Sequence, residues 1–131
     1  MASGPGSFEN DDALEWVDDL EDSFGITMLQ EAFTRVEKNK YPDSVDCCVA
    51  LAAAEVVAAA KGKPSPDLPA GVRSWLEEEE DADSIKSLDK AAIKVVNKIR
   101  NNSELKESWQ DTDDWQEWQR VLNKLEERLR G

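Results

Sequence analysis

Residues 44–61 constrain the fold more than any other part of the chain. They are rich in alanine and valine and contain no proline or glycine, and Gly62 follows in the position of a helix C-terminal stop. A helix over this segment is apolar on nearly all sides, so we expect neighbouring elements to bury it from several directions. Asp46 and Glu55 interrupt the apolar run, which leaves it too short to span a bilayer.

The rest of the chain also has helical rather than strand patterning. Asn10 is a predicted N-cap, Thr27 opens a capping-box pattern, and Asp67 is a predicted cap before a short helix. Apolar residues at steps of three and four predict one further helix from Ile85 to Ile99 and a last helix that ends near Leu129. We therefore predict an all-α, compact single-domain bundle of about six or seven helices around a buried alanine-rich central helix at about 44–61. Residues 1–10 are a flexible or folded-back lead, and residues 11–131 form the single helical domain.

Charge and residue usage exclude several classes of function. The chain has 29 acidic and 16 basic residues, for a net charge of −13, which opposes binding to nucleic acid or to an anionic membrane. It has no histidine, which removes Ser-His-Asp and Cys-His catalysis and histidine-ligated metals. We expect no cofactor and no metal ion. Cys47 and Cys48 diverge by about 100° around a helix, so we expect small core residues rather than a disulfide. No secretory signal is evident, and we expect a cytoplasmic protein.

The first helix carries an acidic stripe beside an apolar face. Asp11, Glu15, Asp18 and Asp22 follow one another at steps of four, three and four residues, and the first basic residue of the chain is Arg35, after nine acids. The stripe could dock a basic partner or hold a cation, or it could be an ordinary solvated face. We expect Leu14, Val17 and Leu20 to form the apolar face, with Trp16 at its edge as an aromatic anchor. The candidate interaction surface consists of Phe8, Asn10, Asp11, Glu15, Trp16, Asp18 and Asp22.

These features favour a non-enzymatic cytoplasmic domain that binds a protein, with a basic protein as the candidate partner. An inhibitor or immunity-type role is one concrete form, because an acidic protein is suited to neutralise a cationic nuclease. One alternative is a metal-assisted hydrolase that uses carboxylates alone. Another is a homo-oligomer built on the seam from Trp115 to Leu129, although this seam spans little more than two heptads, so we expect a monomer.

The N-terminal block also carries a family resemblance. Residues 6–16 read Gly-Ser-Phe-Glu-Asn-Asp-Asp-Ala-Leu-Glu-Trp. This block is similar to the opening signature of the bacterial domain-of-unknown-function family numbered 4259. The likeness continues through residues 53–62, through Leu68-Pro69 before Trp75, and through residues 103–105 before Trp109. The resemblance implies a small helical protein with no established activity. In one departure, Ser3 stands where members of the family often carry a tryptophan in the lead.

Overall fold

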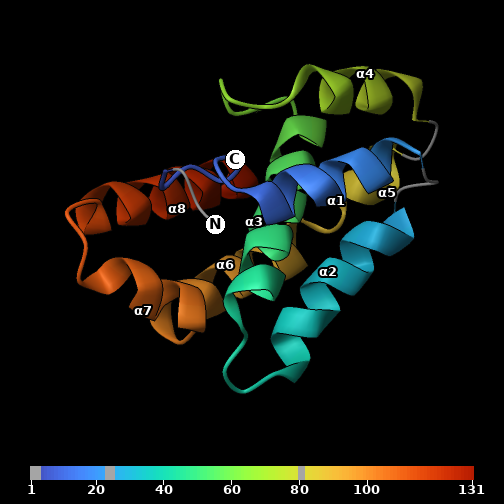
Figure 1. The fold of residues 1–131 in the computed structure, drawn as a ribbon. Helices are drawn as coiled ribbons and strands as arrows, with labels where there is room; N and C mark the ends of the chain where they lie inside the picture. Colours follow the sequence, from blue (N-terminus) through green and yellow to red (C-terminus); the bar gives the residue numbers. More distant parts are fainter. Residues whose placement is uncertain (1–3, 23–25, 80–81) are drawn as a thin grey trace.

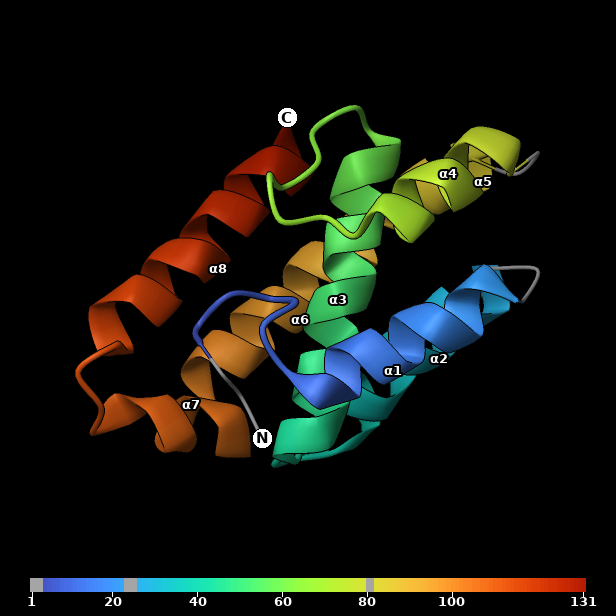
Figure 2. The same cartoon turned by 45° about the horizontal axis from the view of Figure 1, so that its top comes forward.

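Helix α3 (Ser44–Ala60) runs through the middle of the molecule, and the other helices pack around it (Figures 1 and 2). The computed structural model describes residues 4–22, 26–79 and 82–131, and within these ranges it contains eight helices and no strand. The all-α prediction is confirmed. Nowhere in these ranges is a helix long and apolar enough to cross a membrane. The remaining helices are α1 (Asp11–Glu21), α2 (Ile26–Lys38), α4 (Ala70–Glu78), α5 (Ala82–Lys86), α6 (Asp89–Asn101), α7 (Glu104–Gln110) and α8 (Trp115–Arg130).

Both ends of α3 are fixed by local hydrogen bonds. At the N-terminus the side chain of Asp43 accepts a hydrogen bond from the amide of Asp46 at 2.8 Å. At the C-terminus Gly62 has a φ of +84°, and the amide of Lys63 donates to the carbonyl of Ala58 at 3.0 Å, which is a Schellman ending. Between these caps almost every side chain from 47 to 58 is buried, and the small alanines let the helices on all sides approach closely.

The buried face of α1 differs from the expected one. Trp16 lies inside the core at 9% exposure, whereas Leu14 is 43% exposed. The core side of α1 consists of Ala13, Trp16, Val17 and Leu20. The prediction of Trp16 as an edge residue beside a Leu14 face is therefore wrong. Burying the indole removes more apolar surface from water than burying a leucine, which favours this rotation of the helix.

The predicted helix from Ile85 to Ile99 is two helices. A turn at Ser87 and Leu88 separates α5 from α6, and the hydroxyl of Ser87 donates to the carbonyl of Ser84 at 2.6 Å, a local bond that competes with helix continuation. Ile85 is nevertheless buried, so the apolar spacing correctly identified core residues and missed the break.

Two predicted caps are also wrong. Helix α2 already includes Ile26, so Thr27 lies inside the helix rather than at its N-cap. Helix α4 begins after Pro69, which makes no side-chain capping bond. Asp67 lies two residues before Pro69, in a turn where its amide donates to the hydroxyl of Ser65 at 3.2 Å. The proline restricts the backbone before it to extended conformations, which delays the helix start.

The two leucines of α1 give a direct check of this packing. Leu20 is fully buried, so Leu20→Ala should lower the free energy of unfolding by about 3 kcal/mol through lost burial and the cavity left behind. Leu14→Ala should change it by less than about 0.5 kcal/mol, because the side chain is largely in solvent. Urea denaturation of both variants measures the difference. Equal losses would mean that Leu14 belongs to the core.

Candidate functional site

Four carboxylates form an exposed surface on α1, which we call the acidic face. It consists of Asp11, Glu15, Asp18 and Asp22. At about 100° per residue, these four positions lie on the side of the helix opposite its buried residues. All four are exposed, and within the described ranges none of them makes an ion pair. The acidic face therefore projects into solvent without local charge compensation.

The other three candidate residues lie in the interior. Phe8, Asn10 and Trp16 are 7%, 8% and 9% exposed. Asn10 is the N-cap of α1, as predicted, and its side chain accepts from the amide of Ala13 at 2.8 Å. The seven candidates are therefore not one continuous surface. In this conformation the part that a partner could reach consists of the acidic face alone.

Charge is distributed unevenly along the chain. Residues 1–34 contain nine of the 29 acidic residues and none of the 16 basic ones, so this segment carries −9 of the net charge of −13. Helix α8, by contrast, contains Arg120, Lys124, Arg128 and Arg130, and three of these four make ion pairs with glutamates. Figure 1 shows that α1 and α8 lie on different sides of α3. The uncompensated negative charge is thus concentrated on the α1 side.

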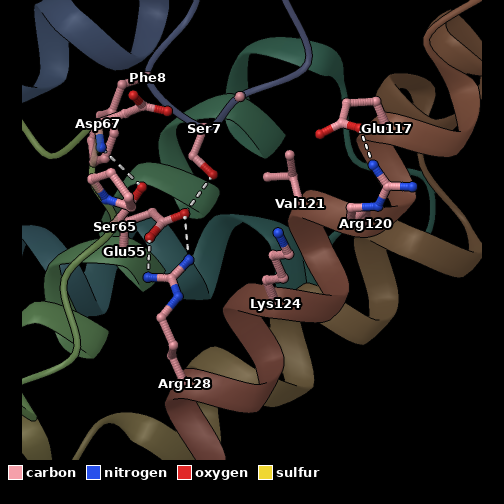
Figure 3. Close-up of a pocket in the computed structure, with 12 residues that line it drawn as sticks. Ser7, Phe8, Glu55, Ser65, Asp67, Glu117, Arg120, Val121, Lys124 and Arg128 are labelled. Atoms are coloured by element: carbon pink, nitrogen blue, oxygen red, sulfur yellow. Dashed lines mark hydrogen bonds and ion pairs between the residues drawn. The ribbon is translucent and has the colours of Figure 1, made fainter.

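A second arrangement of polar groups surrounds Glu55. In the sequence this acid is evident only as an interruption of the apolar run. Its side chain is 2% exposed in the middle of α3. Arg128 of α8 donates from Nη1 to its Oε1 at 2.8 Å and from Nη2 to its Oε2 at 3.4 Å (Figure 3). Ser7 donates from Oγ to Oε2 at 2.8 Å. One buried carboxylate therefore joins the N-terminal lead, the central helix and the last helix. We call Glu55, Arg128 and Ser7 the Glu55 cluster.

The lead is folded back over the bundle in this arrangement. Ser7 and Phe8 are both buried, and Figure 2 shows the lead running between α1 and α8 across α3. Next to the Glu55 cluster, the lead, the 65–67 turn and α8 line a cavity of about 240 Å³ that is partly open to solvent. The side chains of Arg120, Lys124 and Arg128 reach it from one face of α8 (Figure 3).

A family model described as domain of unknown function (DUF4259) matches residues 2–121. The chain belongs to this family. The match extends from the lead into α8 and ends before Lys124 and Arg128. No curated protein and no solved structure matches the chain significantly. Membership in DUF4259 carries no known function, so the function must be argued from the residues.

The other reactive groups of this DUF4259 domain are held in unreactive states. Burial raises the pKa of the Cys47 thiol to about 12 and that of the Cys48 thiol to about 11, so neither is a thiolate at neutral pH. The hydroxyl of Tyr41 donates to Glu107, which raises the pKa of Tyr41 to about 12. Across residues 4–22, 26–79 and 82–131, no group of three or more acidic or cysteine side chains is arranged to hold a metal ion. The side chains of Tyr41, Cys47 and Cys48 are therefore all protonated at neutral pH.

Proposed function

We propose that this DUF4259 protein is a non-enzymatic cytoplasmic domain that binds a basic protein through the acidic face of α1. The observation that carries the proposal is the exposure of Asp11, Glu15, Asp18 and Asp22 without a single ion pair among the described residues. Like-charged residues three and four apart on a helix destabilise it slightly, so, apart from the favourable position of Asp11 in the first turn, the row gives the fold no advantage. A cationic partner would neutralise the row, and the surrounding negative potential would speed its encounter.

An inhibitor or immunity-type role fits this chemistry, because a cationic nuclease presents the basic surface that the acidic face would neutralise. No specific observation favours the two alternatives. The seam considered for homo-oligomerisation is used inside the domain, where Trp118, Leu122, Leu125 and Leu129 are buried and α8 packs on α6 and α3. A carboxylate-only hydrolase would need converging acids, and the acidic face is a single row on one helix.

Neutralising the acidic face should abolish retention of the partner. The variant combines Asp11→Asn, Glu15→Gln, Asp18→Asn and Asp22→Asn. A matched control neutralises four other exposed acids without ion pairs, through Glu77→Gln, Glu78→Gln, Asp111→Asn and Asp113→Asn. Both variants have the same net charge, so the comparison separates the position of the charge from its amount. Immobilised wild type, variant and control are each incubated with bacterial lysate at low and high salt, and the retained proteins are compared.

We expect a basic protein that wild type and control retain at low salt and release at high salt, and that the acidic-face variant does not retain. Two results would contradict the proposal. In one, the variant retains the same proteins as wild type. In the other, the control loses them as well, which would mean that net charge rather than the acidic face is responsible.

A further inference from the structure

We propose that the cavity beside Glu55 binds a small zwitterion, with a free amino acid as the ligand class. The carboxylate of the ligand would pair with Lys124, and its ammonium group would pair with Asp67. This site is separate from the acidic face: it lies between α8, the lead and the 65–67 turn.

The charges that line the cavity are balanced, and most are already paired. Arg128 pairs with Glu55 at 2.8 Å, and Arg120 pairs with Glu117 at 2.7 Å. One cation and one anion remain. Lys124 lies between the two arginines on the same face of α8, and its side chain makes no ion pair or hydrogen bond within the described part of the chain.

The remaining anion is on the opposite wall of the cavity. The amide of Asp67 donates to Ser65, but the carboxylate of Asp67 has no ion pair within the described ranges. Figure 3 shows Lys124 on α8 and Asp67 on the other side of the cavity, with Glu55 and Ser7 between them. The unpaired charges are therefore of opposite sign and come from different elements.

The net charge of the protein distinguishes a zwitterion from a simple anion. With a net charge of −13, the protein repels a small anion at long range, and Lys124 alone does little to offset this. A zwitterion is neutral overall and is not repelled. Lys124 and Asp67 are both exposed to solvent, and the two groups of a zwitterion match these two side chains in sign.

The size of the cavity sets the size of the ligand. Its volume of about 240 Å³ corresponds to roughly eight water molecules at about 30 Å³ each. This is below the range of about 300–1,000 Å³ that is typical for drug-sized ligands. A single amino acid is small enough for this space. Gly6, Ser7 and Phe8 form part of the wall, so the folded-back lead completes the site.

NMR titration of the full ¹⁵N-labelled chain tests the proposal. The probes are the individual free amino acids. For each one that binds, the deaminated acid and the decarboxylated amine are the matched probes that lack one of the two charges. We expect at least one amino acid to cause saturable shifts of the amide signals of Ser65, Asp67, Lys124 and Arg128. Each matched probe should bind about tenfold more weakly or not at all, because each loses one charge-assisted hydrogen bond.

Three variants locate the contacts. Lys124→Gln and Asp67→Asn should each weaken binding about tenfold, since each removes one charged partner of the ligand. Lys94→Gln, at an exposed lysine of α6 without an ion pair, should bind like wild type. The spectrum of each free variant reports whether it is folded. The proposal is overturned if no amino acid causes saturable shifts at the cavity, if the deaminated acid binds as tightly as its amino acid, or if Lys124→Gln and Asp67→Asn leave the affinity unchanged.

Discussion

Arg128→Met should lower the free energy of unfolding by about 3 kcal/mol, because it leaves Glu55 buried without its cation. The Glu55 side chain is only 2% exposed, and Ser7 would be its one remaining hydrogen-bond partner among the residues that the structure describes. Removing one member of a buried ion pair is costly, since the charge that remains has lost both its water and its counter-charge. Urea denaturation followed by far-UV circular dichroism measures the loss.

A control and a double variant give this prediction its specificity. Arg120 also pairs with a glutamate on α8, but both of those side chains are about half exposed, so Arg120→Met should cost no more than about 1 kcal/mol. Combining Arg128→Met with Glu55→Leu removes both buried charges and should recover most of the stability lost in the single variant. If Arg128→Met costs no more than Arg120→Met, Glu55 does not depend on Arg128. If the double variant is less stable than Arg128→Met alone, the buried carboxylate is not the source of the loss.

Trp118→Ala should lower the free energy of unfolding by about 4 kcal/mol, because it creates a large cavity between α8 and the lead. Trp118 is 1% exposed, and it is the largest of the fully buried side chains among the described residues. Its ring stacks on that of Trp115 with 5.6 Å between the ring centroids. Trp115 is only partly buried, so Trp115→Ala removes mainly the stacking contact and should cost about 1 kcal/mol.

Circular dichroism is again the appropriate probe, because both substitutions change the tryptophan fluorescence directly. The informative quantity is the ratio of the two losses in the free energy of unfolding. Similar losses for Trp115 and Trp118 would contradict the packing of α8, since one ring is enclosed by protein and the other is partly in water.

The sequence predicts the elements of this fold better than their exact faces and ends. The helix at 44–61 was predictable because a long apolar segment without proline or glycine favours a buried helix, and the glycine that follows marks its end. The face of α1 was not, because its apolar residues span an arc of about 160°, with Leu14 at one end and Trp16 at the other. The helical periodicity alone cannot decide which of these two end residues faces the core. The break at Ser87 depends on one local hydrogen bond, which apolar spacing does not reveal.

For the Glu55 cluster, too, the sequence indicates part of the arrangement but not all of it. A single acid within an otherwise apolar helix is expected to be buried, and a buried carboxylate needs a partner. The position of Glu55 in the sequence is therefore itself a signal for a buried polar site. The identity of the partners was not accessible, because Arg128 is 73 residues away and Ser7 is 48 residues away. Only the packing of α8 and the lead against α3 brings these three residues together.

The acidic face and the Glu55 cluster place carboxylates in opposite environments. Glu55 is buried and paired, so replacing Glu55 or its partner should lower the free energy of unfolding. The carboxylates of the acidic face are exposed and unpaired, so replacing them should weaken binding of the partner protein. The distinction allows a test of whether the acidic face has a role in the fold, and this test does not require the partner to be known.

That test is the free energy of unfolding of the variant with Asn at 11, 18 and 22 and Gln at 15, measured by urea denaturation beside wild type. The substitutions remove seven like-charge pairs at helical spacing, three within the acidic face and four with Asp12, Asp19 and Glu21, each worth about 0.2–0.5 kcal/mol. They also lose the favourable interaction of Asp11 with the helix N-terminus, worth about 0.3–1 kcal/mol. If the acidic face serves binding, the variant should be as stable as wild type within about 0.5 kcal/mol, or more stable. A loss of more than about 1 kcal/mol, absent from the control neutralised at 77, 78, 111 and 113, would show that these charges serve the fold instead.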